Sequence, residues 1–138
     1  MNKWLRAVCV GAAAAAMLTA SAFAANYTNC ADSLHEMGLF QGTQNGYDLD
    51  RTPTRAEAAV MLVRLLGKEA EVKTLTYTAP FTDLKGWEKP YVQYLHSNGL
   101  VNGTSRMTFN PTGKCTAQMY ATFLLRALGY SDTADFSY

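Results

Sequence analysis

A ten-residue segment occurs twice in this chain, and this repetition limits the possible folds more than any other feature. Residues 34–43 and 95–104 share Leu, His, Gly, Leu, Gly and Thr in the same order, at a constant offset of 61 positions. After a one-residue insertion the offset becomes 62, which aligns Thr54 with Thr116 and Gly67 with Gly129. Such self-similarity indicates a tandem of two related repeats rather than one irregular domain.

Each repeat is predicted to form a helix, a glycine-rich loop and a second helix, so we expect an all-α fold of tandem helix–loop–helix repeats. The first helices end at Gly38 and Gly99, where glycine can adopt the left-handed conformation that ends a helix. Alanine- and leucine-rich second helices are expected at residues 56–66 and 117–128. Neither repeat can bury its apolar face alone, so we expect the two repeats to stack.

These repeats define the expected domain boundaries. The first repeat, at residues 25–67, lacks its N-terminal part, and the second occupies residues 80–130. Residues 68–79 are polar and β-branched, which predicts an extended linker, with a short strand as the alternative. Residues 131–138 are expected to be a tail or the start of a truncated third repeat.

Residues 1–24 have the pattern of a secretory signal peptide. Lys3 and Arg6 precede an apolar, alanine-rich stretch at residues 7–20, and a small-x-small sequence ends at Ala24. The apolar stretch is shorter than the ~20 residues that span a bilayer. We therefore expect cleavage after Ala24, secretion, and no transmembrane segment in the mature chain.

Charge and composition exclude several classes of function. The 12 basic residues nearly balance the 11 acidic ones, so no basic surface is expected for nucleic acid. The two His and three Cys lie far apart, and no Ser or Cys has a recognisable base partner. We therefore expect no metal, no cofactor and no catalytic activity.

Two cysteines, Cys30 and Cys115, lie outside the predicted signal peptide. An oxidising exterior permits a disulfide between them. Two separate thiols are the alternative, because spacing alone does not determine connectivity.

Residues 54–57 read Thr-Arg-Ala-Glu at the start of a predicted helix. Thr54 is a good N-cap, and Glu57 is placed to complete a capping box, which is a purely structural role. Arg55 has no such role, because a cation in the first turn opposes the helix dipole. A guanidinium beside free N–H groups at a helix start would instead suit a carboxylate or a phosphate.

Taken together, these motifs resemble the S-layer homology (SLH) family of exported bacterial proteins. The second repeat contains Phe-x-Asp at residues 81–83, Trp87, Tyr91, a Gly-Leu-x-x-Gly motif at 99–103 and Phe-x-Pro at 109–111. The first repeat contains Gly-Leu-x-x-Gly at residues 38–42 and Thr-Arg-Ala-Glu at 54–57. The resemblance extends from about Cys30 to Gly129.

This resemblance implies a non-catalytic module that anchors an exported protein to the cell wall. Its implied partner is a secondary wall polysaccharide attached to peptidoglycan, bearing a pyruvate ketal. Arg55 would meet the ketal carboxylate, Asp83 and Trp87 would contact sugar hydroxyls and a sugar face, and Gly103 would offer a backbone N–H. Arg55→Ala is then expected to weaken wall binding without unfolding the protein.

This sequence also departs from the family pattern. The first repeat lacks the Phe-x-Asp and Trp segment, and the second has Thr-Ala-Gln-Met at residues 116–119 in place of Thr-Arg-Ala-Glu. At most one composite site is therefore expected. Core packing remains an alternative for Trp87, and capping of the preceding turn is one for Asp83.

Two other functions stay open at this point. The chain could self-associate or bind a protein as a structural surface protein without recognising a sugar. It could also be the targeting half of a larger wall enzyme.

Overall fold

The computed structural model describes residues 27–131 and 134–135. The predicted signal peptide lies outside the described residues. The chain forms two compact units, one ending at Leu49 and one beginning at Asp50. Helices account for the regular structure, and the described residues contain no strand, only the isolated bridges Thr43–Gly46 and Thr54–Lys114. The fold is all-α, as predicted.

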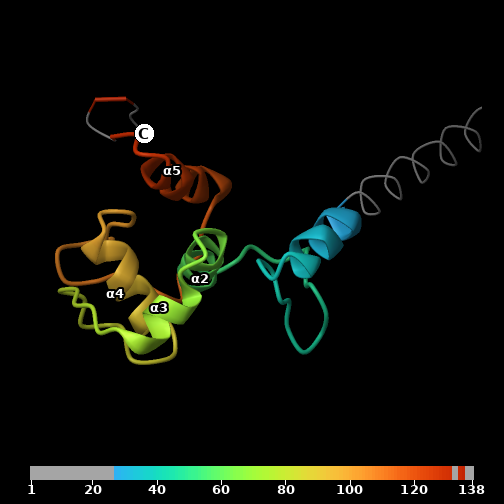
Figure 1. Cartoon of the computed structure of the whole chain (residues 1–138), viewed down its shortest axis with the longest axis horizontal. Helices are drawn as coiled ribbons and strands as arrows, with labels where there is room; N and C mark the ends of the chain where they lie inside the picture. The colour runs from blue at the N-terminus through green and yellow to red at the C-terminus, as the bar shows by residue number, and fades with distance from the viewer. Residues whose placement is uncertain (1–26, 132–133, 136–138) are drawn as a thin grey trace, which may run out of the picture. The chain divides into compact units, whose positions relative to one another are not determined.

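The described residues of the unit that begins at Asp50 form four helices. They are α2 (Arg55–Leu65), α3 (Glu69–Thr74), α4 (Lys89–Ser97) and α5 (Ala117–Ala127). In Figure 1, α3 lies against α4, and α2 lies between this pair and α5. The expectation of an extended segment at residues 68–79 is wrong for Glu69–Thr74. This segment is helical because buried Val72 joins the core, while Lys68 and Lys73 pair with Glu71 and Glu69 along the helix.

The core of this unit joins the two sequence repeats. Helix α2 of the first repeat packs against α4 of the second. The fully buried side chains at its centre come from α2 and α4 and from the segments that flank them: Leu62, Val63, Val72, Val92, Leu95, Val101 and Phe109. Burial of such aliphatic and aromatic side chains contributes about 1.5–3 kcal/mol each. The repeats are therefore stabilised by contacts between them.

Helix ends follow the sequence signals. Thr54 and Glu57 form the capping box at the start of α2. Pro90 lies in the first turn of α4, where its missing N–H costs no hydrogen bond. Gly99 ends this helix with φ +71°, and Leu100 N donates to Leu95 O. This combination is the usual way that a left-handed glycine closes a helix.

The described part of the first unit is small. Residues 27–36 are helical, and Gly38 follows with φ +72°. The loop that comes next folds back through Tyr47, whose hydroxyl donates to Asp32 and whose ring packs near His35 and Phe40. Ala31 is the one buried apolar residue among residues 27–49.

Candidate ligand-binding site

Arg55, the residue expected to meet a carboxylate, is almost completely buried. Its side chain is 5% exposed, and its guanidinium lies 4.4 Å from the centroid of the Phe109 ring. Nε donates to Phe109 O at 2.8 Å, and Nη2 donates to Asn102 O at 3.0 Å. Arg55 therefore ties the start of α2 to the loop of the second repeat.

Asp83 binds the same loop from the other side. Its carboxylate accepts hydrogen bonds from Phe109 N at 2.9 Å and from Asn110 N at 2.7 Å. Partial burial acts to raise the pKa of Asp83, but these two bonds and the charge of Arg55 outweigh it, so the pKa lies below its ordinary value. Asn110 has φ +60°, so the carboxylate secures a strained turn. Asp83 thus fixes the loop at residues 109–110. The alternative role considered for Asp83, capping the turn before Trp87, does not account for these bonds.

The start of α2 does not offer the free N–H groups that the sequence suggested. Arg55 N donates to Gly113 O at 2.8 Å, and Ala56 N donates to Pro111 O at 3.0 Å. Glu57 N donates to the hydroxyl of Thr54. The expectation was wrong because the second repeat supplies carbonyl groups to this helix end, a tertiary contact that no local signal reveals.

Gly103 is required by the space around it. A Cβ added here would lie 2.4 Å from Thr108 O, 2.5 Å from Ser105 O and 2.5 Å from the Phe81 ring. Two of these neighbours are backbone atoms, which cannot move aside as a flexible side chain could. Gly103 therefore lets the loop at residues 102–108 close tightly against Phe81.

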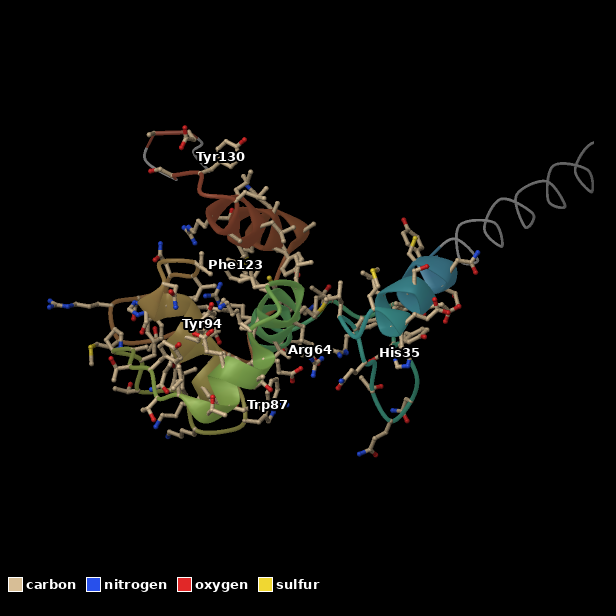
Figure 2. All side chains as sticks on the ribbon, viewed as in Figure 1. His35, Arg64, Trp87, Tyr94, Phe123 and Tyr130 are labelled. Carbon is tan, nitrogen blue, oxygen red and sulfur yellow. The ribbon has the colours of Figure 1, made fainter. Side chains whose placement is uncertain are left out.

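Trp87 is separate from this cluster. Its side chain is 60% exposed, so packing in the core does not explain it. In Figure 2, Trp87 lies near α3, whereas Phe123, a residue of α5 whose ring centroid is 5.8 Å from the Arg55 guanidinium carbon, lies elsewhere in the unit. The structure thus brings Arg55, Asp83 and Gly103 to one loop and leaves Trp87 on another part of the surface.

The two helix caps differ between the repeats. At α2, Thr54 N donates to the Glu57 carboxylate at 2.7 Å, and Arg51 forms a forked ion pair with the same carboxylate at 2.9 Å for each bond. The Arg51 bonds, aided by those from Thr54, outweigh partial burial and lower the pKa of Glu57 to about 2. At α5, Thr116 caps Met119 N with no acidic partner in the first turn. The change of Glu to Met therefore weakens the second cap.

Both cysteines carry free thiols in the structure. Cys30 is exposed on the N-terminal unit, and Cys115 is buried in the other unit. Burial raises the pKa of the Cys115 thiol, and the nearby charge of Arg55 only partly opposes this. The disulfide stays a prediction.

Phe109 is the residue of this cluster that sequence reasoning missed as a functional element. Its ring is fully buried under the Arg55 guanidinium, and its backbone binds both Arg55 and Asp83. The Phe-x-Pro motif was the available signal, but the motif does not reveal which distant side chains hold it.

Neither a metal centre nor a membrane span is found in the described part of the chain. Its His, Cys, Asp and Glu side chains form no group of three or more that could hold a metal ion. No helix there has the length and apolar character needed to cross a membrane.

Comparison with known proteins agrees with the motifs. Residues 80–116 match the family described as the S-layer homology domain. The chain is 34% identical over 119 residues to the middle cell wall protein of Brevibacillus brevis, which covers 84% of this chain and 11% of that protein. It is 33% identical over 100 residues to the surface layer protein of Brevibacillus choshinensis, and this match covers 70% of this chain and 9% of that protein.

A third relative has a different name. An endoglucanase of a Bacillus species is 33% identical over 98 residues, which is 70% of this chain and 10% of that protein. The chain thus spans about a tenth of the length of the curated relatives that it matches. This chain carries an S-layer homology domain at residues 80–116, which include Asp83 and Gly103.

Proposed function

We propose that this chain is a non-catalytic module of the bacterial cell surface that anchors an exported protein to the cell wall. One observation carries the proposal: about 100 residues recur in proteins named for the cell wall, for the surface layer and for an endoglucanase activity. In each relative this region is about a tenth of the length. A short region common to proteins of such different names fits attachment to a shared structure better than it fits one shared reaction.

The proposed partner is a secondary cell-wall polysaccharide, with the carboxylate of a pyruvate ketal as its charged group. Arg55 would contribute the positive charge of the site, and its bonds to Asn102 O and Phe109 O would fix the shape of the loop that the sugar meets. Arg106 and Lys114 are exposed on the same loop and would add positive charge near its surface.

Asp83, Gly103 and Trp87 have distinct parts in this proposal. Asp83 Oδ2 accepts from both Phe109 N and Asn110 N, whereas Oδ1 accepts from Phe109 N and keeps a second lone pair that a sugar hydroxyl would use. Gly103 keeps the loop tight enough for the sugar to approach its backbone. The exposed indole of Trp87 would cover an apolar sugar face at some distance from Arg55. A polymer is long enough to contact this indole and the loop at the same time.

Co-sedimentation with cell walls tests this function. Protein secreted by an expressing bacterium is mixed with walls that retain the secondary polysaccharide and with walls from which it has been removed chemically. We expect binding to the first preparation and its loss with the second. Equal binding to both would place the partner in peptidoglycan, and folded protein that binds neither would contradict the anchor function.

Trp87→Ala and Leu65→Ala form a matched pair for the same assay, because both side chains are about half exposed or more and Leu65, at the end of α2, lies outside the loop that the sugar would meet. We expect the first change to reduce wall binding and the second to leave it unaltered. Unchanged binding by Trp87→Ala would remove this indole from the site.

A further inference from the structure

The packing of α2 on α4 is a joint between two repeats. The second helix of the first repeat contacts the first helix of the next repeat, and their apolar side chains share one core. The residues that the first repeat contributes to this core include Ala59 and Val63 on α2, which are fully buried, and Leu66 at its C-cap, which is partly buried. We call this contact the α2–α4 joint.

Helix α5 is the equivalent of α2 in the second repeat, but the matching face is uncovered. The offset of 62 aligns Ala59, Val63 and Leu66 with an apolar stripe on α5 made of Ala121, Leu125 and Leu128. Ala121 is exposed, Leu125 is partly exposed, and Leu128 is 74% exposed. The other side of α5 packs on α2 through buried Phe123. The stripe therefore has the apolar side chains that α2 uses in the α2–α4 joint, but among the described residues no helix corresponding to α4 covers it.

Residues 27–36 are the equivalent of α4 in the first repeat, and here too the matching face is incompletely covered. The offset of 61 aligns Leu34 with Leu95, which is fully buried in the joint. Leu34 itself is partly exposed, although Ala31, the equivalent of Val92, is buried. The chain thus contains a second helix equivalent to α2, which is α5, and a second helix equivalent to α4, which is helix 27–36.

We propose that α5 of one copy packs against helix 27–36 of a second copy, in the manner of the α2–α4 joint. The contact is heterologous, because the two faces come from different parts of the chain, and each copy keeps one face of each kind for another neighbour. Such contacts produce closed rings or open chains of copies, depending on the rotation at each joint.

The order of the helices within the repeats favours this pair over a contact between two α5 helices. The α2–α4 joint combines the second helix of one repeat with the first helix of another. Helix α5 is the second helix of its repeat and helix 27–36 is the first helix of its own, so this pair reproduces the joint, whereas two α5 helices would not. The inference is independent of the proposed function, because it needs no sugar.

The experiment uses one variant for each face. Leu128→Glu places a charge on the exposed stripe of α5, and Leu34→Glu places one on helix 27–36. Leu65→Glu is the matched control, because Leu65 is about half exposed on α2 and lies outside both faces. The mass of secreted protein is measured by analytical ultracentrifugation over a concentration series, with circular dichroism to verify folding.

We expect wild type and Leu65→Glu to rise above the monomer mass with concentration, while each face variant alone stays monomeric. An equimolar mixture of the two face variants should form a dimer and nothing larger, because each retains the face that the other lacks. Monomeric wild type, association of either face variant alone, or a monomeric mixture would overturn the proposal. If Leu34→Glu does not fold, Leu34→Ala takes its place and should weaken association at least several-fold.

Discussion

Arg55 and Asp83 bind the two backbone groups of a single residue, Phe109. Arg55 Nε donates to its carbonyl at 2.8 Å, and Asp83 accepts from its N–H at 2.9 Å. The two side chains come from different repeats, since Arg55 begins α2 and Asp83 precedes α4. Arg55 therefore joins the two repeats through Phe109, and Asp83 fixes the same residue from within the second repeat.

Arg55→Ala should destabilise the fold as well as the site. It leaves the carbonyls of Phe109 and Asn102 without their donors in a buried position, which costs about 2–4 kcal/mol in free energy of unfolding. This revises the sequence expectation that the variant keeps its stability. Urea unfolding measures the change, and Arg51→Ala is the control, because its exposed ion pair is worth about 1 kcal/mol at most. Equal effects of the two variants would contradict a structural role for Arg55.

Gly103→Ala should be more destabilising than Gly99→Ala. A Cβ at Gly103 would overlap two backbone oxygens and the Phe81 ring, so the loop must open, at a cost of about 1–3 kcal/mol or more. A Cβ at Gly99 meets no atom within 4 Å, and the cost is only that of its positive φ, about 1 kcal/mol. Thermal unfolding of both variants gives the comparison. A smaller loss of melting temperature at Gly103 than at Gly99 would show that the loop tolerates expansion.

Stability should fall in acid through Glu57. Its pKa in the folded protein is about 2, below the ordinary value of 4.5, so the folded state binds fewer protons than the unfolded state between these values. The contribution of Glu57 is therefore complete above about pH 4.5 and is lost as the pH falls toward about 2. Urea unfolding over this range should show a weaker pH dependence in Glu57→Gln than in wild type. Identical slopes would mean that the Arg51–Glu57 pair does not stabilise the fold.

Trp87→Ala should leave the stability nearly unchanged, because the side chain is 60% exposed and lies outside the core. The expected change in free energy of unfolding is within about 1 kcal/mol. Chemical denaturation of the secreted protein measures this separately from wall binding. A loss of several kcal/mol would mean that the indole packs against the protein rather than covering a ligand.

The two cysteines should react at different rates with a thiol reagent. Cys30 is exposed and should be modified in the native protein, whereas Cys115 is buried and its pKa is raised, so it should react only after unfolding. Timed labelling followed by mass spectrometry of peptides distinguishes them. Absence of reaction at both sites in unfolded, unreduced protein would establish the disulfide that the sequence allows. Cys30→Ser supplies the control for the assignment.

The local features of this protein were predictable from sequence. Helices α2 and α5 begin and end within one or two residues of the expected positions, because caps and left-handed glycines act over a few residues. The weaker cap of α5 was predictable in the same way, because the sequence itself shows Thr116 at the cap and no acidic residue in the first turn that follows. Segment 68–79 was harder, since the helical state of Glu69–Thr74 depends on burial of Val72 by distant residues.

By itself, the sequence determined the repeated motifs, the ends of α2 and α5, and the S-layer homology domain at residues 80–116, because each depends on patterns that are local or recur at a fixed offset. Only the tertiary structure decided what Arg55, Asp83 and Trp87 contact. Arg55 is separated by about 50 positions from the carbonyls that it binds, and no pattern near residue 55 specifies Asn102 or Phe109 as partners. A buried guanidinium must satisfy its donors wherever acceptors lie, and the packing of α2 on the second repeat placed those acceptors on one loop.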